Sequence, residues 1–304
     1  MNHTTIEWVK NPDGTQGYTL NSKTGCLNHT PEGLCLGGLF PCYAYKLANG
    51  RLRARYLANK TCAPVLEPPL HYIPSPQNQA DPFYPRWWAE RIKEPYQMKK
   101  PAGIFLDDMS DWMGDYWPES WTMAELQMMR DNPQHRIYTL TKQPQNLIKF
   151  SPFPDNCWVG VTACTDESCL GALLYLRDVL CSVRFLSIEP LLEATALTAE
   201  KLKACGIKWL IIGAMTGTLD NIKKACVYTS QELKPIPYGK RWTLQPKIEW
   251  VEEIVKAADK AGVKVFLKEN LKLLILQHAE DKNSQWADRI LDSGGRLRQE
   301  VPNP

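Results

Sequence analysis

Short apolar runs alternate with longer segments of helical periodicity along most of this chain. Runs of five or six apolar residues are typical of strands buried on both faces of a parallel sheet. Strand–helix units at this spacing favour a parallel β/α barrel or a doubly wound sheet. We predict an α/β fold whose strands are residues 17–21, 102–106, 136–140, 157–162, 183–188, 207–212 and 263–267.

The segments between these runs carry the signals of helices. Thr198 is a suitable N-cap, with Glu200 in the first turn that follows it. Gly262 stands where a glycine commonly ends a helix. The predicted helices are residues 119–130, 144–150, 167–181, 198–205 and 246–261.

A proline-rich segment interrupts the pattern. Residues 61–101 contain nine of the 23 prolines, which excludes a continuous helix or a central strand. Within it, residues 83–93 are predicted to form a short helix that presents Trp87 and Trp88. We interpret 61–101 as an insertion in a single domain spanning 1–304, and a linker between two domains is the alternative.

The composition is that of an ordinary globular protein. Apolar residues make up 44% and charged residues 23%, which argues against disordered and fibrous classes, and a net charge of +3 does not by itself indicate nucleic-acid binding. The N-terminal residues lack the apolar stretch of a signal peptide, and no run reaches the roughly 18 apolar residues of a membrane span. We expect a cytoplasmic protein with reduced thiols and no membrane partner.

Three cysteines lie in one glycine-bearing loop within residues 24–56, ahead of a helix-like run. Cys26, Cys35 and Cys42 have the spacing C-x8-C-x6-C, and thiolates are soft metal ligands. A [4Fe–4S] cluster with one open iron takes three thiolates, whereas structural zinc takes four ligands, of which His29 can be the fourth. The spacing leaves both metal sites open, and unliganded thiols as well.

The chain resembles a phage-associated three-cysteine-motif family of unknown function, which is radical-SAM-like. The resemblance rests on Ile6-Glu7-Trp8, Thr24-Gly25-Cys26, Cys42-Tyr43-Ala44, Met109-Ser110-Asp111, Pro133-Gln134-His135, Leu140-Thr141-Lys142 with Pro144, Trp158-Val159-Gly160-Val161, Arg184-Phe185-Leu186-Ser187, Glu189-Pro190-Leu191-Leu192 and Ala261-Gly262-Val263 with Phe266 and Lys268.

This resemblance implies a TIM-like barrel, partial or full, of the radical SAM type, with Cys26, Cys35 and Cys42 as ligands of a [4Fe–4S] cluster. It further implies S-adenosylmethionine as cofactor and hydrogen abstraction from an unknown substrate as the reaction. Two alternatives are a zinc-stabilised nucleic-acid-binding protein and a non-catalytic phage or host interaction protein on a barrel fold.

The chain departs from the family pattern in two places. Leu39 stands where the middle cysteine is usual, so Cys35 has to bend back to take that role. A late Gly-Gly-Glu-Ser-Gly motif reads Gly213-Ala214-Met215-Thr216-Gly217 and lacks the carboxylate.

Polar residues at the carboxyl ends of the predicted strands are candidate cofactor contacts, because active residues of β/α barrels lie there. Lys142 or Lys268 can pair with the carboxylate of S-adenosylmethionine. Capping of helices, or an exposed Lys268–Glu269 pair, is the structural alternative. The predicted cofactor-binding residues are Tyr43 (beside the adenine), Asp108, Ser110, Lys142, Thr162, Glu189, Gly213 and Lys268.

Two further groups have a functional and a structural interpretation. Arg51, Arg53 and Arg55 either form a solvated helix face or contact nucleic acid. Cys164 and Cys169 either donate to a second metal site or lie in the core as free thiols. A separate partner protein that delivers the substrate is left open.

Overall fold

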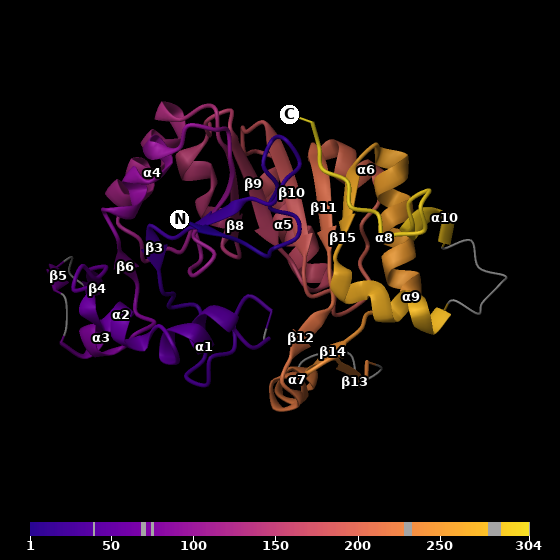
Figure 1. Ribbon diagram of the computed structural model, residues 1–304, viewed down its shortest axis with the longest axis horizontal. Coiled ribbons are helices and arrows are strands. Elements are labelled where there is room, and N and C mark those ends of the chain that lie inside the picture. The colour runs from indigo at the N-terminus through magenta and orange to yellow at the C-terminus, as the bar shows by residue number, and fades with distance from the viewer. Residues whose placement is uncertain (39, 68–70, 74–75, 228–232, 279–286, 304) are drawn as a thin grey trace. The chain divides into compact units, whose positions relative to one another are not determined.

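The computed structural model describes residues 1–304 except 39, 68–70, 74–75, 228–232, 279–286 and 304. The chain has an α/β fold with a mostly parallel main sheet (Figure 1). It divides into two compact units, the first formed by residues 1–37, 42–159 and 180–182 and the second by 38–41, 160–179 and 183–304. The single domain over 1–304 stays a prediction.

The first unit contains the first half of the main sheet. β2 pairs in parallel with β7, and β7 with β8, so that Thr19 lies opposite Phe105 and Ile104 opposite Ile137. All four residues of β7 are buried, as expected of a strand covered on both faces. The strand order is β1 (Asn2–His3), β2 (Tyr18–Leu20), β7 (Gly103–Leu106) and β8 (Arg136–Thr141), followed by the start of β9 (Cys157–Thr162).

Short strands, short helices and one longer helix, α4, complete the first unit. The strands are β3 (Lys23–Thr24), β4 (Val65–Glu67), β5 (His71–Ile73) and β6 (Arg86–Trp87), and the helices are α1 (Tyr43–Asn49), α2 (Arg53–Ala58), α3 (Pro76–Ala80) and α4 (Glu119–Asp131). Single 3₁₀ turns are η1 (Arg91–Lys93), η2 (Pro95–Gln97), η3 (Pro144–Asn146) and η4 (Ile148–Phe150). The helix predicted over 144–150 is therefore two 3₁₀ turns.

The helix predicted over 83–93 is wrong. Arg86 and Trp87 form β6, which pairs antiparallel with Thr24 and Lys23 of β3. The guanidinium of Arg86 is fully buried and donates to three carbonyl oxygens at 2.8–3.0 Å. These tertiary hydrogen bonds fix an extended backbone that the helical periodicity of the segment did not indicate.

The second unit contains the other half of the sheet and most of the longer helices. The end of β9 is followed in strand order by β10 (Val183–Ile188), β11 (Ile207–Ile212) and β15 (Lys264–Leu267), with β10–β11 and β11–β15 parallel. A smaller antiparallel sheet, β12 (Met215–Gly217), β14 (Arg241–Leu244) and β13 (Pro235–Tyr238), was not predicted. The helices and the 3₁₀ turn of the second unit are α5 (Asp166–Leu176), α6 (Ala199–Ala204), α7 (Leu219–Cys226), α8 (Ile248–Ala261), η5 (Glu269–Leu271), α9 (Lys272–His278) and α10 (Ala287–Ile290).

Helix ends in this unit follow the predicted signals. The Thr198 side chain accepts a hydrogen bond from Lys201 N at 3.3 Å and caps α6, which packs beside α8 (Figure 1). Gly262 ends α8 with φ 71°, in the left-handed region that favours glycine. α5 ends at Leu176, earlier than the predicted Cys181. No helix of the described ranges is long and apolar enough to cross a membrane.

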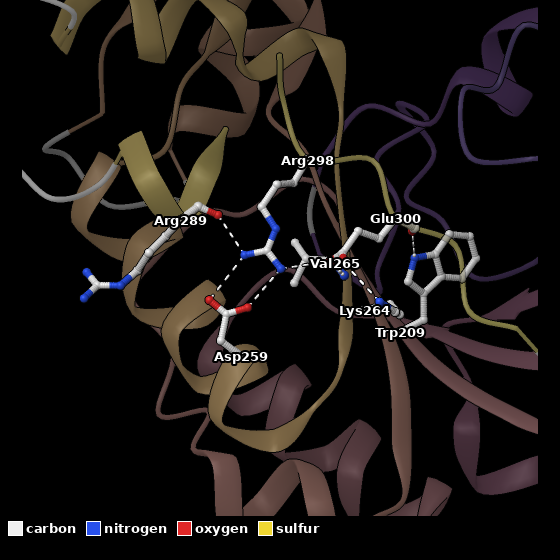
Figure 2. A network of polar contacts seen from close by, with 7 residues as sticks. All are labelled: Trp209, Asp259, Lys264, Val265, Arg289, Arg298 and Glu300. Atoms are coloured by element: carbon white, nitrogen blue, oxygen red, sulfur yellow. Dashed lines mark hydrogen bonds and ion pairs between the residues drawn. The ribbon is translucent and has the colours of Figure 1, made fainter. Parts of the chain in front are cut away.

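The last residues of the chain bind to the outer strand of the second unit. Leu267 N donates to Arg298 O at 2.7 Å, and Glu300 N donates to Val265 O at 2.9 Å. The Arg298 guanidinium donates to both carboxylate oxygens of Asp259 at 2.9 and 3.2 Å, as Figure 2 shows. This tail therefore covers the edge of β15 that would otherwise expose unpaired backbone groups.

Replacing Arg298 by alanine is expected to lower the free energy of unfolding by about 2–4 kcal/mol, because Asp259 and Glu300 lose a charge-assisted, largely buried partner. Arg298→Lys should restore part of that loss, since lysine cannot donate in a bidentate fashion. Urea denaturation measures both. The control is Arg296→Ala, whose side chain is 82% exposed. Equal effects at 296 and 298 would contradict this role.

Candidate cysteine site at the strand ends

The cysteine loop starts at the carboxyl ends of two parallel strands. Gly25 forms a parallel bridge with Ser110, and Cys26 N donates to Phe83 O at 3.0 Å. Gly25 has φ +89°, and a Cβ there would lie 2.5 Å from the carbonyl oxygens of Phe83 and Tyr84. Only glycine fits this position, and the backbone fixes Cys26 just beyond β2 and β7.

A backbone N–H group is directed at each of the three loop sulfurs. Asn28 N lies 3.2 Å from Cys26 Sγ, and Tyr45 N lies 3.5 Å from the Sγ of Cys42, the N-cap of α1. The Gly37 N–H is a hydrogen-bond donor to Cys35. Such donors stabilise negative charge on sulfur and are one of the means by which proteins tune iron–sulfur clusters.

Burial favours the protonated forms of the Cys26 and Cys35 thiols. Burial raises the pKa of Cys26 to about 12, and the Asp111 carboxylate acts in the same direction. Burial also raises the pKa of Cys35, while the Lys142 ammonium opposes this shift. Cys35 affects the pKa of Cys26, and Cys42 that of Cys35, so neighbouring thiols lie within electrostatic range of one another.

The sulfurs are not gathered into a ligand set. Across the described residues, no three His, Cys, Asp or Glu side chains have an arrangement that could hold a metal ion. His29 Nδ1 lies 2.7 Å from Thr30 O, and its ring packs against Tyr45 and Phe83. A metal at His29 would have to bind Nε2. Leu39, the residue at the position of the usual middle cysteine, lies outside the described residues.

Tyr116 is a neighbour of Cys26 that the sequence did not reveal. Its hydroxyl is buried, and a hydrogen bond joins it to the Cys26 side chain. Burial raises the pKa of Tyr116 well above the ordinary value, and Cys26 and Asp111 raise it further. As a hydrogen-bond donor, Tyr116 lowers the pKa of Cys26 and so opposes part of the rise that burial causes. No motif surrounds Tyr116, so spacing alone could not identify it.

A buried charge network lies directly behind the loop. Lys23 Nζ is 2.8 Å from Glu125 Oε2, and both side chains are 0% exposed. Trp112 Nε1 and Ser22 Oγ donate to the two oxygens of Glu125 at 3.0 and 2.8 Å. Lys23 N donates to Asp107 Oδ1 at 2.9 Å. The sequence predicted no role for Lys23 or Glu125, which lie about 100 residues apart.

Two carboxyl groups thus share one lysine. Burial raises the pKa of Asp107 well above its ordinary value, and the Glu125 carboxylate raises it further while Lys23 lowers it. Among the residues that the structure describes, Asp107 Oδ2 has no hydrogen-bond partner of normal geometry, and Asp107 has φ 59°. A protonated Asp107 leaves one carboxylate for one ammonium, so the interior stays close to neutral.

The predicted cofactor residues of the first unit lie around this loop. The Tyr43 hydroxyl donates to Asp108 O, and Asn21 Nδ2 donates to Asp108 Oδ1 at 2.6 Å. Ser110 Oγ lies 3.4 Å from Asp107 O. Lys142 N donates to Asp111 Oδ2 at 3.1 Å. The Lys142 side chain packs against Gly37, since a Cβ added to Gly37 would lie 2.8 Å from the Cβ and Cδ atoms of Lys142. The geometry therefore brings Lys142 to the cysteine loop.

In the second unit, three more predicted residues come together. Lys268 forms an ion pair with Glu189, and a Cβ on Gly213 would lie 3.1–3.2 Å from these two side chains. Glu269, the residue of the alternative Lys268–Glu269 pair, forms an ion pair with Lys272. Asn270 donates to Ala214 O at 2.7 Å and accepts from Ala214 N. Thr162 is buried at the end of β9.

Cys164 and Cys169 are core thiols. Both are 0% exposed, and Cys164 packs with Leu192 and Met215. Burial raises the pKa of Cys169 to about 12, with Asp166 and Glu193 adding to the shift. The described residues contain no metal-ligand group here either.

Comparison with known proteins identifies the family but no activity. The family model described as "Protein of unknown function (DUF5131)" matches residues 3–225, so the chain belongs to that family. No curated protein matches the chain.

Solved structures of spore photoproduct lyase resemble this chain. One is complexed with dinucleoside spore photoproduct: it is 11% identical, its TM-score is 0.49, and the match covers 88% of this chain and 81% of that one. Another, a variant with bound AdoMet and dinucleoside spore photoproduct, is 11% identical with a TM-score of 0.46, over 88% of this chain and 80% of that one. At this identity and these scores the likeness assigns no reaction to this chain.

Asp107→Asn should change how stability depends on pH. In the wild type, the raised pKa of Asp107 makes the folded state hold a proton that the unfolded chain releases near pH 4. The contribution of Asp107 to the free energy of unfolding therefore falls as the pH rises toward the pKa of the folded state. The neutral amide, in a residue type that tolerates positive φ, removes that dependence. The free energy of unfolding of the variant, relative to wild type, should rise between about pH 5 and pH 8, by at most about 1.4 kcal/mol per pH unit.

Urea denaturation at several pH values measures this difference. The control is Asp13→Asn, an exposed residue whose pKa is lowered, chiefly by a hydrogen bond from Thr15. Asp13 stays ionised in the folded and unfolded states over this pH range. The difference in the free energy of unfolding between the Asp13→Asn variant and the wild type should therefore be constant. A constant difference for the Asp107 variant would show that Asp107 is ionised in the folded protein.

Proposed function

We propose that this chain is an iron–sulfur protein of the radical SAM type. Cys26, Cys35 and Cys42 would hold a [4Fe–4S] cluster that binds S-adenosylmethionine. We also propose that the strands and helices form a partial or full β/α barrel of the radical SAM type. The observation that supports it best is the set of three loop thiols, with Cys35 buried and Cys26 and Cys42 partly buried. Each has a backbone N–H donor, and each lies within electrostatic range of a neighbour.

The donor chemistry of the loop fits a cationic group. Without one, Cys26 holds its proton because burial and Asp111 raise its pKa to about 12. A bound metal displaces thiol protons and supplies the missing positive charge. The loop has to close further for this, since its sulfurs are not yet arranged as ligands among the described residues.

When bound, a [4Fe–4S] cluster with an open iron supplies the electron that cleaves a carbon–sulfur bond of S-adenosylmethionine, leading to hydrogen abstraction from a substrate. The residues of the chain would bind and orient this cofactor. Lys142 would present a cation beside Cys35 that pairs with the carboxylate of S-adenosylmethionine. Asp108 would provide a hydrogen-bond acceptor for the ribose or the amino group of the cofactor. Tyr43 is exposed and offers a ring for the adenine. Ser110, Thr162, Glu189, Gly213 and Lys268 stay predicted contacts of the same cofactor.

Anaerobic purification should give a brown protein with about four iron and four sulfide per chain. Serine at position 26, 35 or 42 should each reduce iron to less than about one atom per chain, since each position supplies one of three ligands. The control is Cys62→Ser, which changes a thiol outside the loop. Iron, sulfide and zinc are measured by elemental analysis, and cleavage of S-adenosylmethionine by release of 5′-deoxyadenosine.

The same measurements separate the alternatives. One zinc per chain and no chromophore would support a zinc site with His29, in which case His29→Ala should lose the metal. No metal at all would support a non-catalytic interaction protein. An intact cluster in the Cys35→Ser protein would contradict the role of Cys35.

Lys142→Met should weaken binding of S-adenosylmethionine to the cluster-loaded protein by roughly 10-fold or more, because a charge-assisted hydrogen bond to its carboxylate is lost. Equilibrium dialysis with labelled cofactor measures the dissociation constant. Lys149→Met, a change in a side chain that is 56% exposed, should leave it unchanged. Equal affinities of the Lys142 variant and wild type would exclude Lys142 as the carboxylate ligand.

A further inference from the structure

The segment after the cysteine loop has a one-sided charge. Residues 33–66 contain no Asp or Glu, but they contain Lys46, Arg51, Arg53, Arg55 and Lys60. A protein with a net charge of +3 therefore concentrates five cations in 34 residues. Clustered charge of one sign, rather than net charge, marks an electrostatic binding surface.

These cations are available at the surface. All five are exposed, and they lie on or beside α1 and α2 (Figure 1). Within the described part of the chain, none of the five has an ion pair with a carboxylate. Unneutralised arginines on a short helix raise the local positive potential, which favours a polyanion.

A pocket of about 430 Å³ opens beside α2. Its lining includes Arg55, Asn59, Thr61, Trp87 and Trp88, with Glu90 as its one carboxylate. Pockets of roughly 300–1,000 Å³ are of the size that binds small organic groups. This pocket thus combines aromatic walls, amide and hydroxyl groups, and a guanidinium at its edge.

The aromatic walls are rigidly supported. Trp87 stacks on Trp121 with ring centroids 5.4 Å apart and an interplanar angle of 22°. Trp87 N donates to Thr61 O at 2.9 Å, and Trp88 Nε1 donates to Thr24 Oγ1 at 2.8 Å. The Arg91 guanidinium lies 3.7 Å from the centroid of the Trp88 ring. Fixed indole rings lose little conformational freedom on binding and provide faces for stacking.

We propose that Arg51, Arg53, Arg55, Lys60, Trp87 and Trp88, here named the Arg–Trp surface, bind single-stranded nucleic acid. The exposed cations attract the phosphate backbone, and Arg55 lies with Trp87 in the lining of the pocket. A base enters the pocket and stacks on the half-buried Trp87. Proteins that bind single strands combine a positive track with aromatic stacking in this way. A duplex keeps its bases paired and stacked, so it would use the cations without the pocket. The proposal does not depend on the cofactor proposed for the cysteine loop.

The test is fluorescence anisotropy of the full-length protein, as purified, with a fluorescein-labelled oligothymidine of about 12 nucleotides. The salt concentration is varied from about 50 to 300 mM. Replacing Arg51, Arg53 and Arg55 together by alanine should weaken binding at least roughly tenfold and reduce the salt dependence, d log K/d log[salt], by about 2 in magnitude, since each phosphate contact contributes about 0.7. The control removes three exposed cations elsewhere, Lys203, Lys208 and Lys240, and should leave binding within about twofold.

Two more variants separate stacking from charge. Trp87→Ala should weaken binding of the oligothymidine by about fivefold to 100-fold with the salt dependence unchanged, and Trp87→Phe should retain most of the affinity. Arg51, Arg53 and Arg55 changed together to lysine should retain most of the salt dependence. Circular dichroism confirms that each variant is folded.

Three results would overturn the proposal. The first is no binding of the oligothymidine at about 50 mM salt. The second is an equal loss of affinity in the lysine control, which would indicate attraction by net charge alone. The third is a Trp87→Ala protein that binds as tightly as wild type, or tighter binding of the matching duplex, either of which would show that the pocket takes no base.

Discussion

The ion pair between Lys23 and Glu125 is the constraint on which the cysteine site depends. Both side chains are fully buried, and removing either partner of such a pair typically costs about 3–5 kcal/mol because the other charge is left uncompensated. Lys23 precedes Cys26 by three residues, whereas Glu125 lies on α4. The pair therefore ties the start of the cysteine loop to a helix from a distant part of the chain. For the third member, Asp107, burial and the Glu125 carboxylate raise the pKa well above its ordinary value, which favours the protonated carboxyl.

The cysteine loop itself combines a rigid start with a less constrained remainder. Gly25 and Cys26 are held by backbone hydrogen bonds to Met109 and Phe83, and no residue with a Cβ fits at position 25. Cys35 and Cys42 are held more locally, by the Gly37 N–H and by the N-terminus of α1. A group that supplies positive charge would stabilise the thiolate forms of Cys26 and Cys35, whose pKa values burial raises. A bound metal would displace their protons, which would be released to the solvent.

The proline-rich insertion contributes more than a covering for the fold. Its residues Phe83–Trp88 carry the carbonyl that accepts from Cys26 N, the buried Arg86, and the two tryptophans of the Arg–Trp surface. Arg86 donates to carbonyl oxygens rather than to a carboxylate, so the insertion is stabilised by satisfying backbone acceptors. The same strand pairing that orders the start of the cysteine loop also orients Trp87 toward its pocket. The two proposed sites of the first unit thus share one structural support.

The sequence by itself determined seven strands of the main sheet, β2, β7, β8, β9, β10, β11 and β15, and the ends of helices such as α6 and α8. The runs at 157–162, 183–188 and 207–212 coincide with β9, β10 and β11, because a strand buried on both faces needs an uninterrupted apolar run. The cap at Thr198 and the glycine at 262 depend on neighbouring residues alone, so local chemistry was sufficient.

Only the tertiary structure decided which distant groups meet. Three pairs show this: Lys268 with Glu189, Lys23 with Glu125, and Tyr116 with Cys26. The two residues of each pair lie between 79 and 102 positions apart in the sequence, and no sequence motif links them. The tertiary structure also replaced the helix predicted over 83–93 by β6, whose backbone pairs with β3 and whose Arg86 side chain donates to three carbonyl oxygens. Periodicity records which face of an element is buried, but it carries no information about the partner that covers that face.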